Sequence, residues 1–288
     1  MKIITTNSEM TTISKNIQKN GKTIAFVPTM GFLHEGHTTL FDKAKEYSDV
    51  TAASLFVNPT QFAPNEDYSQ YPRDSERDIA LAEQHNIDYL FIPDALEIYP
   101  IGFSTSVILK NVTDRFEGKF RPGHFDGVAL VVAKLFNIVK PEFAIFGQKD
   151  YQQTLVIKQM VRDLNFDVKI IVSPTVRLSN GLAMSSRNTY LSDEEKENAT
   201  ILYKAMGMAK TAIANGERER KNINAIMHQT LRTIPGIRLD YASAALASDL
   251  TEPDLFYPND HIVLLLAVYL GKTRLIDNFL ISIPNSKS

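Results

Sequence analysis

The sequence has no cysteine among its 288 residues, which excludes disulfide bonds, thiolate metal sites and a cysteine nucleophile. It also lacks any apolar run of about 18 residues, the length needed for a membrane-spanning helix, and its longest runs, such as 262–270, are the size of strands. Residues 1–10 do not show the basic and then apolar pattern of a signal peptide. We therefore expect a soluble, cytoplasmic protein that does not associate with membranes.

The sequence also lacks a strong excess of charge of one sign. Its formal net charge is −2 and neither half is strongly basic, so we expect no general binding to nucleic acid. Hydrophobic residues make up 44% of the chain and include 16 Phe and 11 Tyr, which is enough for an ordinary globular core. The length favours one large domain and a smaller one.

Two common glycine-rich phosphate motifs are absent as well. Residues 21–23 and 271–273 both read Gly-Lys-Thr, as at the end of a P-loop, but the residue five positions before each glycine is Asn16 or Leu266 and not glycine. No GxGxxG pattern occurs. The hypotheses of a P-loop ATPase and of a Rossmann dehydrogenase therefore lose their main support.

Up to about residue 175, the sequence alternates apolar, strand-like runs with helix-like segments. The strand-like runs are 22–28, 50–57, 87–93, 142–147 and 168–172, and the helix-like segments are 36–47, 73–85, 125–139 and 150–164. Because the runs are apolar on both faces, residues 1–175 are predicted to form a Rossmann-like, doubly wound α/β domain with a parallel sheet. Ligands of such sheets bind beyond the carboxyl ends of the strands, so loops 28–37, 58–72 and 147–150 should share one rim.

The pattern changes after residue 175. Residues 173–188 are polar and rich in Ser and Asn, which is typical of a connector or a functional loop. Two predicted helices, near 193–215 and 219–233, are followed by strand-like runs at 239–247, 262–269 and 273–279. Residues 176–288 are therefore predicted to form a smaller α+β domain.

The segment 28–37, PTMGFLHEGH, links a predicted strand to a predicted helix. Backbone N–H groups at a helix start attract anions, and Gly31 and Gly36 let a ligand approach the backbone closely. His34 and His37 face the same side of the first turn, where imidazoles can donate hydrogen bonds to phosphate oxygens. The plain alternative is a capped helix with two exposed histidines. Zinc is disfavoured because the pattern is not HExxH and cysteine ligands are absent.

A second motif, VNPTQF, follows the second predicted strand. Its Asn58 and Gln61 offer neutral donors and acceptors that suit recognition of a hydroxyl or a carboxylate. An ordinary Asn-Pro turn is the alternative. The long loop that follows is a candidate lid and contains Asn65, Glu66, Asp67, Tyr68, Tyr71 and Arg73.

Two more motifs carry charge that suits phosphates. In GQKDYQQ, Lys149 can supply a point charge and Gln153 lies one helical turn later. Residues 184–187, Met-Ser-Ser-Arg, combine hydroxyls with a cation in a polar loop, which suits β- and γ-phosphate binding. Each motif alone is also compatible with an ordinary helix start or an exposed loop.

Taken together and in this order, the motifs closely resemble the pantothenate synthetase family, the pantoate–β-alanine ligases. The family patterns PTMGxLHxGH, VNPxQF, GxKDYQQ and GLAMSSRN match, and residues 120–128, FRPGHFDGV, add a fifth match. The matching segments extend from residue 24 to about residue 191. More broadly, the chain is similar to nucleotidyltransferases with HIGH and KMSKS signatures. Residues 34–37 correspond to the first, and 184–187 to the second without its usual lysines.

The resemblance implies an ATP-dependent, AMP-forming ligase of pantothenate and coenzyme A biosynthesis. Pantoate would attack the α-phosphorus of ATP to give pantoyl adenylate and pyrophosphate, with Mg²⁺ on the phosphates. The amine of β-alanine would then attack the acyl carbon to give pantothenate and AMP. The family further implies a homodimer, no tightly bound organic cofactor, and a C-terminal domain that covers the active-site cleft. The lack of an obvious covalent nucleophile fits catalysis by positioning and charge stabilisation.

The resemblance also assigns catalytic and nucleotide-binding residues. His37 is the expected catalytic donor, with His34 and Lys149 as further catalytic residues. The expected ATP-binding residues are Met30, His34, Gly36, His37, Gly147, Lys149, Asp150, Val176, Met184, Ser185, Ser186 and Arg187.

The acid substrate and the metal are assigned in the same way. Gln61 and Gln153 are expected to hold pantoate, with Gln61 near β-alanine too. Asp78 matches a position linked with Mg²⁺. Four apolar residues would either form a wall against the gem-dimethyl group of pantoate or belong to the plain core: Val131, Val132, Leu135 and Phe146.

Two positions depart from the common family pattern. Phe32 replaces a residue that is usually small, just before His34, and Asn180 stands where Asp is frequent. Because Asn and Asp both tolerate turns, we expect the loop geometry to survive.

Two other functions remain open. A nucleotidyltransferase acting on nicotinamide mononucleotide or phosphopantetheine is disfavoured by VNPTQF and GQKDYQQ, which fit a carboxylic-acid pocket. A nucleotide-binding regulator without turnover is disfavoured because both histidines, Lys149 and Arg187 are all present.

Overall fold

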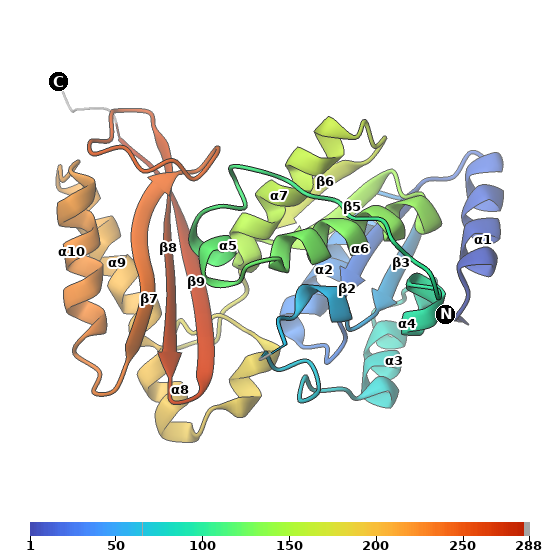
Figure 1. The fold of residues 1–288 in the computed structure, drawn as a ribbon, viewed down its shortest axis with the longest axis horizontal. Coiled ribbons are helices and arrows are strands. Elements are labelled where there is room, and N and C mark those ends of the chain that lie inside the picture. The colour runs from blue at the N-terminus through green and yellow to red at the C-terminus, as the bar shows by residue number, and fades with distance from the viewer. Residues whose placement is uncertain (65, 285–288) are drawn as a thin grey trace. The chain divides into compact units, whose positions relative to one another are not determined.

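The computed structural model describes residues 1–64 and 66–284, so Asn65 of the candidate lid and residues 285–288 lie outside it. The chain forms two compact units (Figure 1). The first contains Met1–Gln148 and Gln152–Pro174, and the second contains Lys149–Tyr151 and the residues from Thr175 onward. The short segment Lys149–Tyr151 therefore belongs with residues that follow it by at least 24 positions.

The first unit is built on a six-stranded sheet with the order β1-β4-β3-β2-β5-β6. The strands are β1 (Lys2–Ile4), β2 (Ile24–Thr29), β3 (Val50–Leu55), β4 (Tyr89–Phe91), β5 (Phe143–Gly147) and β6 (Lys169–Ser173). Neighbouring strands pair in parallel. The chain runs outward from β2 through β3 to β4 and returns to β5 on the other side of β2. The direction of winding therefore reverses between β2 and β5, which is where such sheets bind ligands.

Helices cover both faces of this sheet. They are α1 (Asn7–Lys19), α2 (Glu35–Lys45), α3 (Ser75–Gln84), α4 (Ala95–Ile98), α5 (Phe116–Phe120), α6 (His124–Val139) and α7 (Tyr151–Asp163), with short 3₁₀ turns η1 (Pro59–Gln61) and η2 (Gln148–Asp150). Alternate residues of β2 enter different cores. Ile24 and Phe26 pack with α1, α6 and α7, whereas Ala25 and Val27 pack with α2 and α3. The predicted doubly wound α/β fold is confirmed.

The described residues of the second unit form η3 (Ser186–Tyr190), three helices and a three-stranded antiparallel sheet of order β7-β8-β9. The helices are α8 (Asp193–Ala199), α9 (Ile201–Ala214) and α10 (Arg220–Leu231), and the strands are β7 (Arg238–Leu246), β8 (His261–Leu270) and β9 (Thr273–Ser282). One face of the sheet packs with α9 and α10 into a single core. The predicted α+β composition is confirmed, although the helix expected near 193–215 is divided at Thr200.

The sequence patterns missed β1 and α1. β1 buries only Ile4 among its three residues, so it has no apolar run. The available signal for α1 was Thr6, whose side chain accepts a hydrogen bond from the N–H of Glu9 as an N-cap. In the part of the chain that the structure describes, no helix is long and apolar enough to cross a membrane.

Candidate active site

The loop between β2 and α2 presents the two histidines at the start of α2. His34 is the N-cap of that helix, and its ring Nδ1 accepts a hydrogen bond from the backbone N–H of Gly36 at 3.1 Å. The Nδ1 of His37 in turn accepts the backbone N–H of His34 at 3.3 Å. Since both rings accept at Nδ1, each neutral imidazole carries its proton on Nε2. The start of α2 thus places two imidazole Nε2–H donors at the positive end of the helix dipole.

The two rings lie close together, with centroids 4.1 Å apart. Reciprocal capping holds them there. His34 accepts a backbone N–H of the first helical turn, and His37, the third residue of the helix, accepts the backbone N–H of His34. A capped helix is therefore what the structure contains, and the caps themselves orient both imidazoles. The structural and the functional interpretations of this motif are compatible.

The backbone just before His34 is held by Asp78 of α3. The carboxylate accepts the N–H of Phe32 at 2.6 Å and that of Leu33 at 2.7 Å. Its side chain is buried, with 2% of the residue exposed, and burial raises the pKa of Asp78 against the opposing effect of these two N–H groups. Gly31 has φ +83°, and a Cβ there would lie 2.9 Å from Asp78 Oδ2. Glycine is therefore required at this position.

This geometry does not suit Asp78 as a direct ligand of Mg²⁺. Both oxygens already accept backbone N–H groups at short distances, and the described residues contain no cluster of three or more His, Cys, Asp or Glu that could hold a metal ion. The predicted metal role of Asp78 stays a prediction, and the contacts favour a role in shaping the loop.

Phe32, the bulky departure from the family pattern, fits into this loop by stacking. It has φ +50°, an uncommon backbone conformation for a non-glycine residue. The guanidinium of Arg77 lies 5.2 Å from the centre of its ring, and Arg77 also donates to the carbonyl of Leu33 at 2.9 Å. Arg77 and Asp78 of α3 thus support the loop.

The VNPTQF motif brings Gln61 to Met30. The side-chain amide of Gln61 donates to the sulfur of Met30 at 3.1 Å, and the amide of Asn58 donates to Gln61 Oε1, also at 3.1 Å. Asn58 is buried and additionally donates to the carbonyl of Gly127 and accepts the hydroxyl of Tyr99. Asn58 therefore serves to orient Gln61. The structure places Gln61 beside the β2 loop, as expected if the two loops share one rim.

At the end of β5, Gly147 faces open space, since a Cβ added there would meet no atom within 4 Å. Packing within the protein therefore does not explain a glycine at this position. Of the two adjacent glutamines on α7, Gln152 is buried and bonded to the backbone of Glu117, Val112 and Arg115. Gln153, the predicted pantoate ligand, is only partly buried.

The four expected wall residues all lie in the core cluster on one face of the first sheet. Val131, Val132, Leu135 and Phe146 are each at most 5% exposed. These four residues therefore belong to the protein core, and a contact with pantoate stays a prediction.

Within the second unit, the segment that carries Lys149 is anchored to the antiparallel sheet. Asn278 of β9 donates to the carbonyl of Lys149 at 2.9 Å, and the hydroxyl of Tyr151 donates to the carbonyl of Ala247 at 2.6 Å. The ammonium of Lys149 lies 3.9 Å from the carboxylate of Asp150. These backbone anchors fix the position of both charged residues with respect to β9.

The polar loop 175–188 belongs to the same unit and is closed on itself. Met184 donates its N–H to the carbonyl of Val176 at 3.0 Å, which pairs the two residues predicted to flank adenine. Asn180 accepts the N–H of Leu182 at 3.2 Å, so the turn expected at this departure from the family pattern is confirmed. Ser185 caps η3 by accepting the N–H of Arg187 at 3.3 Å.

A buried ion pair ties this loop to β9. Arg177 donates to both carboxylate oxygens of Asp277, at 2.7 and 2.8 Å, and its guanidinium lies 4.9 Å from the centre of the Tyr203 ring and 5.0 Å from that of Phe279. Sequence patterns gave no indication of Arg177, because its partner lies 100 residues away. The predicted phosphate-binding residues Ser185 and Ser186 lie where this loop enters η3.

Comparison with known proteins shows which family these features belong to. The model of the family described as pantoate-beta-alanine ligase matches residues 2–280. The chain belongs to the pantoate–β-alanine ligase family. The chain is 51% identical to a pantothenate synthetase of Caldicellulosiruptor saccharolyticus, over 96% of this chain and 97% of the relative. It is 49% identical to that of Thermodesulfovibrio yellowstonii, over 98% of this chain and all of the relative.

Solved structures of the family have the same fold. The pantothenate synthetase of Thermus thermophilus matches with a TM-score of 0.91 and 40% identity, over 99% of this chain and 100% of that chain. A pantoate-beta-alanine ligase of Francisella tularensis, complexed with beta-gamma ATP and beta-alanine, matches with a TM-score of 0.80 and 38% identity, over 97% of both chains. The resemblance inferred from the motifs is confirmed, and the chain is a ligase that uses ATP to join pantoate and β-alanine.

Proposed function

We propose that this pantoate–β-alanine ligase works through a pantoyl adenylate, at a site centred on the two histidines that begin α2. The observation that carries the proposal is their reciprocal capping. Because His34 and His37 both accept backbone N–H groups at Nδ1, each neutral ring can offer its Nε2–H to a phosphate oxygen.

In the first half-reaction, a carboxylate oxygen of pantoate attacks the α-phosphorus of ATP, and the bond between the α-phosphorus and the bridging oxygen of pyrophosphate breaks. Negative charge grows on the α-phosphoryl oxygens and on the leaving pyrophosphate. His37 donates to the α-phosphoryl group and His34 to the neighbouring phosphate, assisted by the helix start and by Gly36, which leaves the backbone accessible. Met30 lines the nucleotide site beside them.

Pantoate is held by the amide groups of Gln61 and Gln153. Gln61 suits this role because Asn58 and Met30 fix its side chain and still leave it one N–H and one lone pair for a ligand. An amide held in this way can bind the hydroxyl and carboxylate of pantoate without rearranging. The resulting alignment of the carboxylate with the α-phosphorus is the main source of rate acceleration that neutral groups can supply.

In the second half-reaction, the free amine of β-alanine attacks the acyl carbon of pantoyl adenylate. A C–N bond forms, the bond from the acyl carbon to the bridging oxygen breaks, and AMP leaves with that oxygen. The amine loses a proton in the process. Gln61 lies next to the acyl group in this arrangement and also contacts β-alanine.

The family resemblance assigns further nucleotide-binding roles to residues of the second unit. Lys149, Ser185, Ser186 and Arg187 bind phosphates, Asp150 binds the ribose, and Val176 and Met184 flank the adenine. The pairing of Val176 with Met184 supports the last assignment, because it fixes two apolar side chains at neighbouring positions. The open space at Gly147 supports close approach of the nucleotide to the end of β5.

Mg²⁺ enters as part of the substrate MgATP, where it neutralises charge on the phosphates. No described cluster of carboxylates and imidazoles fits a protein-held ion, and Asp78 is engaged by backbone N–H groups. Mg²⁺ is typically bound by substrate phosphates, waters and few protein ligands, which agrees with this arrangement.

We further propose that the enzyme is a cytoplasmic homodimer that does not bind nucleic acid. The net charge of −2 supports the last point, since nucleic-acid binding needs a basic surface. Sedimentation equilibrium tests the dimer, which predicts twice the mass of the 32.4 kDa chain.

The experiment that tests the adenylate is exchange of labelled pyrophosphate into ATP, with Mg²⁺ and pantoate present and β-alanine absent. We expect exchange that requires pantoate, because the first half-reaction is reversible without an acceptor. A protein that binds ATP but shows no pantoate-dependent exchange would contradict the proposed intermediate. The matched controls are reactions without pantoate and reactions in which β-alanine replaces pantoate.

A further inference from the structure

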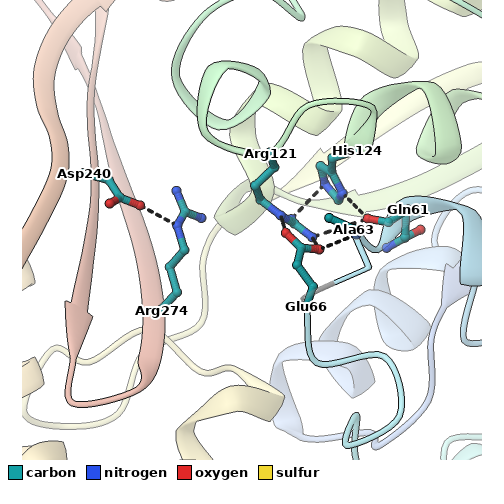
Figure 2. Close-up of polar contacts among 7 residues, drawn as sticks. All are labelled: Gln61, Ala63, Glu66, Arg121, His124, Asp240 and Arg274. Carbon is teal, nitrogen blue, oxygen red and sulfur yellow. Dashed lines mark hydrogen bonds and ion pairs between the residues drawn. The ribbon is translucent and has the colours of Figure 1, made fainter.

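The FRPGHFDGV segment has no role in the reaction described above, yet its polar residues converge on Gln61. Figure 2 shows Arg121 and His124 beside Gln61, with the carboxylate of Glu66 against the guanidinium of Arg121. Arg121 precedes α6, and His124 begins it. All of these residues lie in the first unit, and the arrangement they form can be followed contact by contact.

His124 binds the main chain of Gln61. Its ring Nδ1 lies 2.9 Å from the carbonyl oxygen of Gln61, and its Nε2 lies 3.1 Å from the guanidinium Nη1 of Arg121. A carbonyl can only accept, so Nδ1 carries the proton. Arg121 can only donate, so Nε2 is the acceptor. The neutral tautomer protonated at Nδ1 is the one that satisfies both contacts, and His124 is buried with 9% of its surface exposed.

Arg121 connects the same carbonyl to the loop that follows. Its Nε and Nη2 donate to the two carboxylate oxygens of Glu66, at 2.7 and 2.8 Å, and Nη2 also lies 3.5 Å from the carbonyl of Gln61. Glu66 in turn accepts the N–H of Ala63 at 3.3 Å. Both charged side chains are largely buried. A planar fork that binds two oxygens at once fixes orientation as well as distance.

Gly127 brings the helix close enough for these contacts. A Cβ at Gly127 would lie 2.2 Å from the carbonyl oxygen of Thr60 and 2.7 Å from Cα of Gln61, so only glycine fits against η1. The carbonyl of Gly127 also accepts the amide of Asn58. Arg121, His124 and Gly127 are spaced three residues apart, and all three contact the segment that carries Gln61.

We propose that Arg121, His124 and Gly127 form a clamp on the backbone of Gln61 that positions its side chain for pantoate, and that Glu66 fastens the loop 62–73 to the same clamp. Arg121 and His124 are thus positioning residues that act through Gln61. This inference rests on the proposed function, because the role of Gln61 in binding pantoate is part of that proposal. The clamp and the loop contact are properties of the first unit alone.

The test separates the hydrogen bond from the packing of His124. His124→Leu removes both polar contacts, whereas the amide nitrogen of His124→Asn lies near the place of Nδ1 and can still donate to Gln61. We expect His124→Leu to raise the KM for pantoate by about tenfold, the value of one lost hydrogen bond, with the KM for ATP changed by less than about twofold. His124→Asn should recover most of this loss.

Unchanged pantoate KM in a folded His124→Leu enzyme would overturn the clamp, as would equal rises in the KM for pantoate and for ATP. Equal rises would indicate general damage to the fold. Failure of the wild-type enzyme to catalyse pantoate-dependent exchange would instead contradict the proposed function. The next experiment does not depend on catalysis.

Glu66→Gln tests the loop contact without disturbing the core. The variant keeps the shape of Glu66 but loses its charge, so we expect faster cleavage by chymotrypsin after Tyr68, by about tenfold, measured by mass spectrometry of the fragments. Glu46→Gln is the matched control, since it removes an exposed ion pair with Lys43 elsewhere in the unit. Equal cleavage rates in the wild type and both variants would refute the fastening of the loop.

Discussion

In the proposed mechanism, the two histidines of α2 combine a structural and a chemical task in single side chains. Nδ1 of each ring closes a cap, and we propose that Nε2–H donates to the phosphates of ATP. Such a division can be separated by mutation, because asparagine reproduces an acceptor near the Nδ1 position but has nothing at Nε2. The sequence could indicate this motif because all of its contacts are local.

His37→Ala should lower the rate of pantoate-dependent exchange by about 10² to 10⁴, as expected for loss of one catalytic donor. His37→Asn should lose a similar factor but retain the thermal stability of the wild type, because the cap survives. Exchange rates and melting curves of both variants check this. Near-normal exchange in either one would remove His37 from the catalytic group.

Asp78 gives a second prediction at this scale. Asp78→Asn leaves one acceptor for two backbone N–H groups, so we expect a loss of about 1–3 kcal/mol in unfolding free energy, with slower exchange. The Mg²⁺ concentration for half-maximal exchange should not change. Urea denaturation and a Mg²⁺ titration measure the two quantities, and a large rise in the Mg²⁺ requirement would restore the metal role.

His124 should make stability depend on pH. Burial, followed by the charge of Arg121, lowers the pKa of His124 to about 4 from its ordinary value of 6.5, whereas Glu66, Glu117 and the Gln61 carbonyl act in the opposite direction. Below about pH 6.5, the unfolded chain therefore takes up a proton that the folded protein does not, and stability falls with falling pH.

Between about pH 7 and about pH 5, this histidine should cost roughly 2 kcal/mol of unfolding free energy. The difference between the wild type and His124→Asn isolates the effect, because other titrating groups are shared. Urea denaturation at both pH values measures it. Parallel losses in the two proteins would show that His124 does not titrate in this way.

At the scale of elements, the close approach of α6 to η1 decides where Gln61 lies. Gly127→Ala should cost about 1–3 kcal/mol of unfolding free energy, because the added methyl group would overlap the backbone of Thr60. Gly207→Ala, in α9, is the control. A Cβ there meets no atom within 4 Å, and alanine should stabilise the helix by about 0.5–1 kcal/mol. Chemical denaturation compares the two, and equal effects would contradict the tight contact.

The elements also show what sequence patterns can and cannot predict. The buried strands β2, β3 and β5 and the apolar helix α6 were predictable, because burial on both sides leaves an apolar run that needs no knowledge of partners. β1 was not, since it lies at the sheet edge and buries one residue. The support of the β2 loop by Asp78 joins residues 45 and 46 positions apart, which no local pattern encodes.

At the scale of the whole molecule, the two units are not continuous stretches of sequence, because long-range contacts place one short segment in the other unit. Lys149–Tyr151 interrupts the first unit in sequence but is bonded to Ala247 and Asn278, which lie 96 and 129 positions away from Tyr151 and Lys149. The family resemblance supplied what local patterns could not, because it assigned Lys149 and Arg187 to the same nucleotide. The contacts of Lys149–Tyr151 with Ala247 and Asn278 show where Lys149 lies in the second unit.

The central claim is that a bond forms between pantoate and the α-phosphoryl group before β-alanine reacts. Pantoate labelled with ¹⁸O in its carboxyl group tests this most directly, with unlabelled ATP, Mg²⁺ and β-alanine, followed by mass spectrometry of all phosphate-containing products. A pantoyl adenylate predicts one labelled oxygen in AMP and none in pyrophosphate, since AMP leaves with the bridging oxygen. Unlabelled AMP, or label in inorganic phosphate released with ADP, would contradict it.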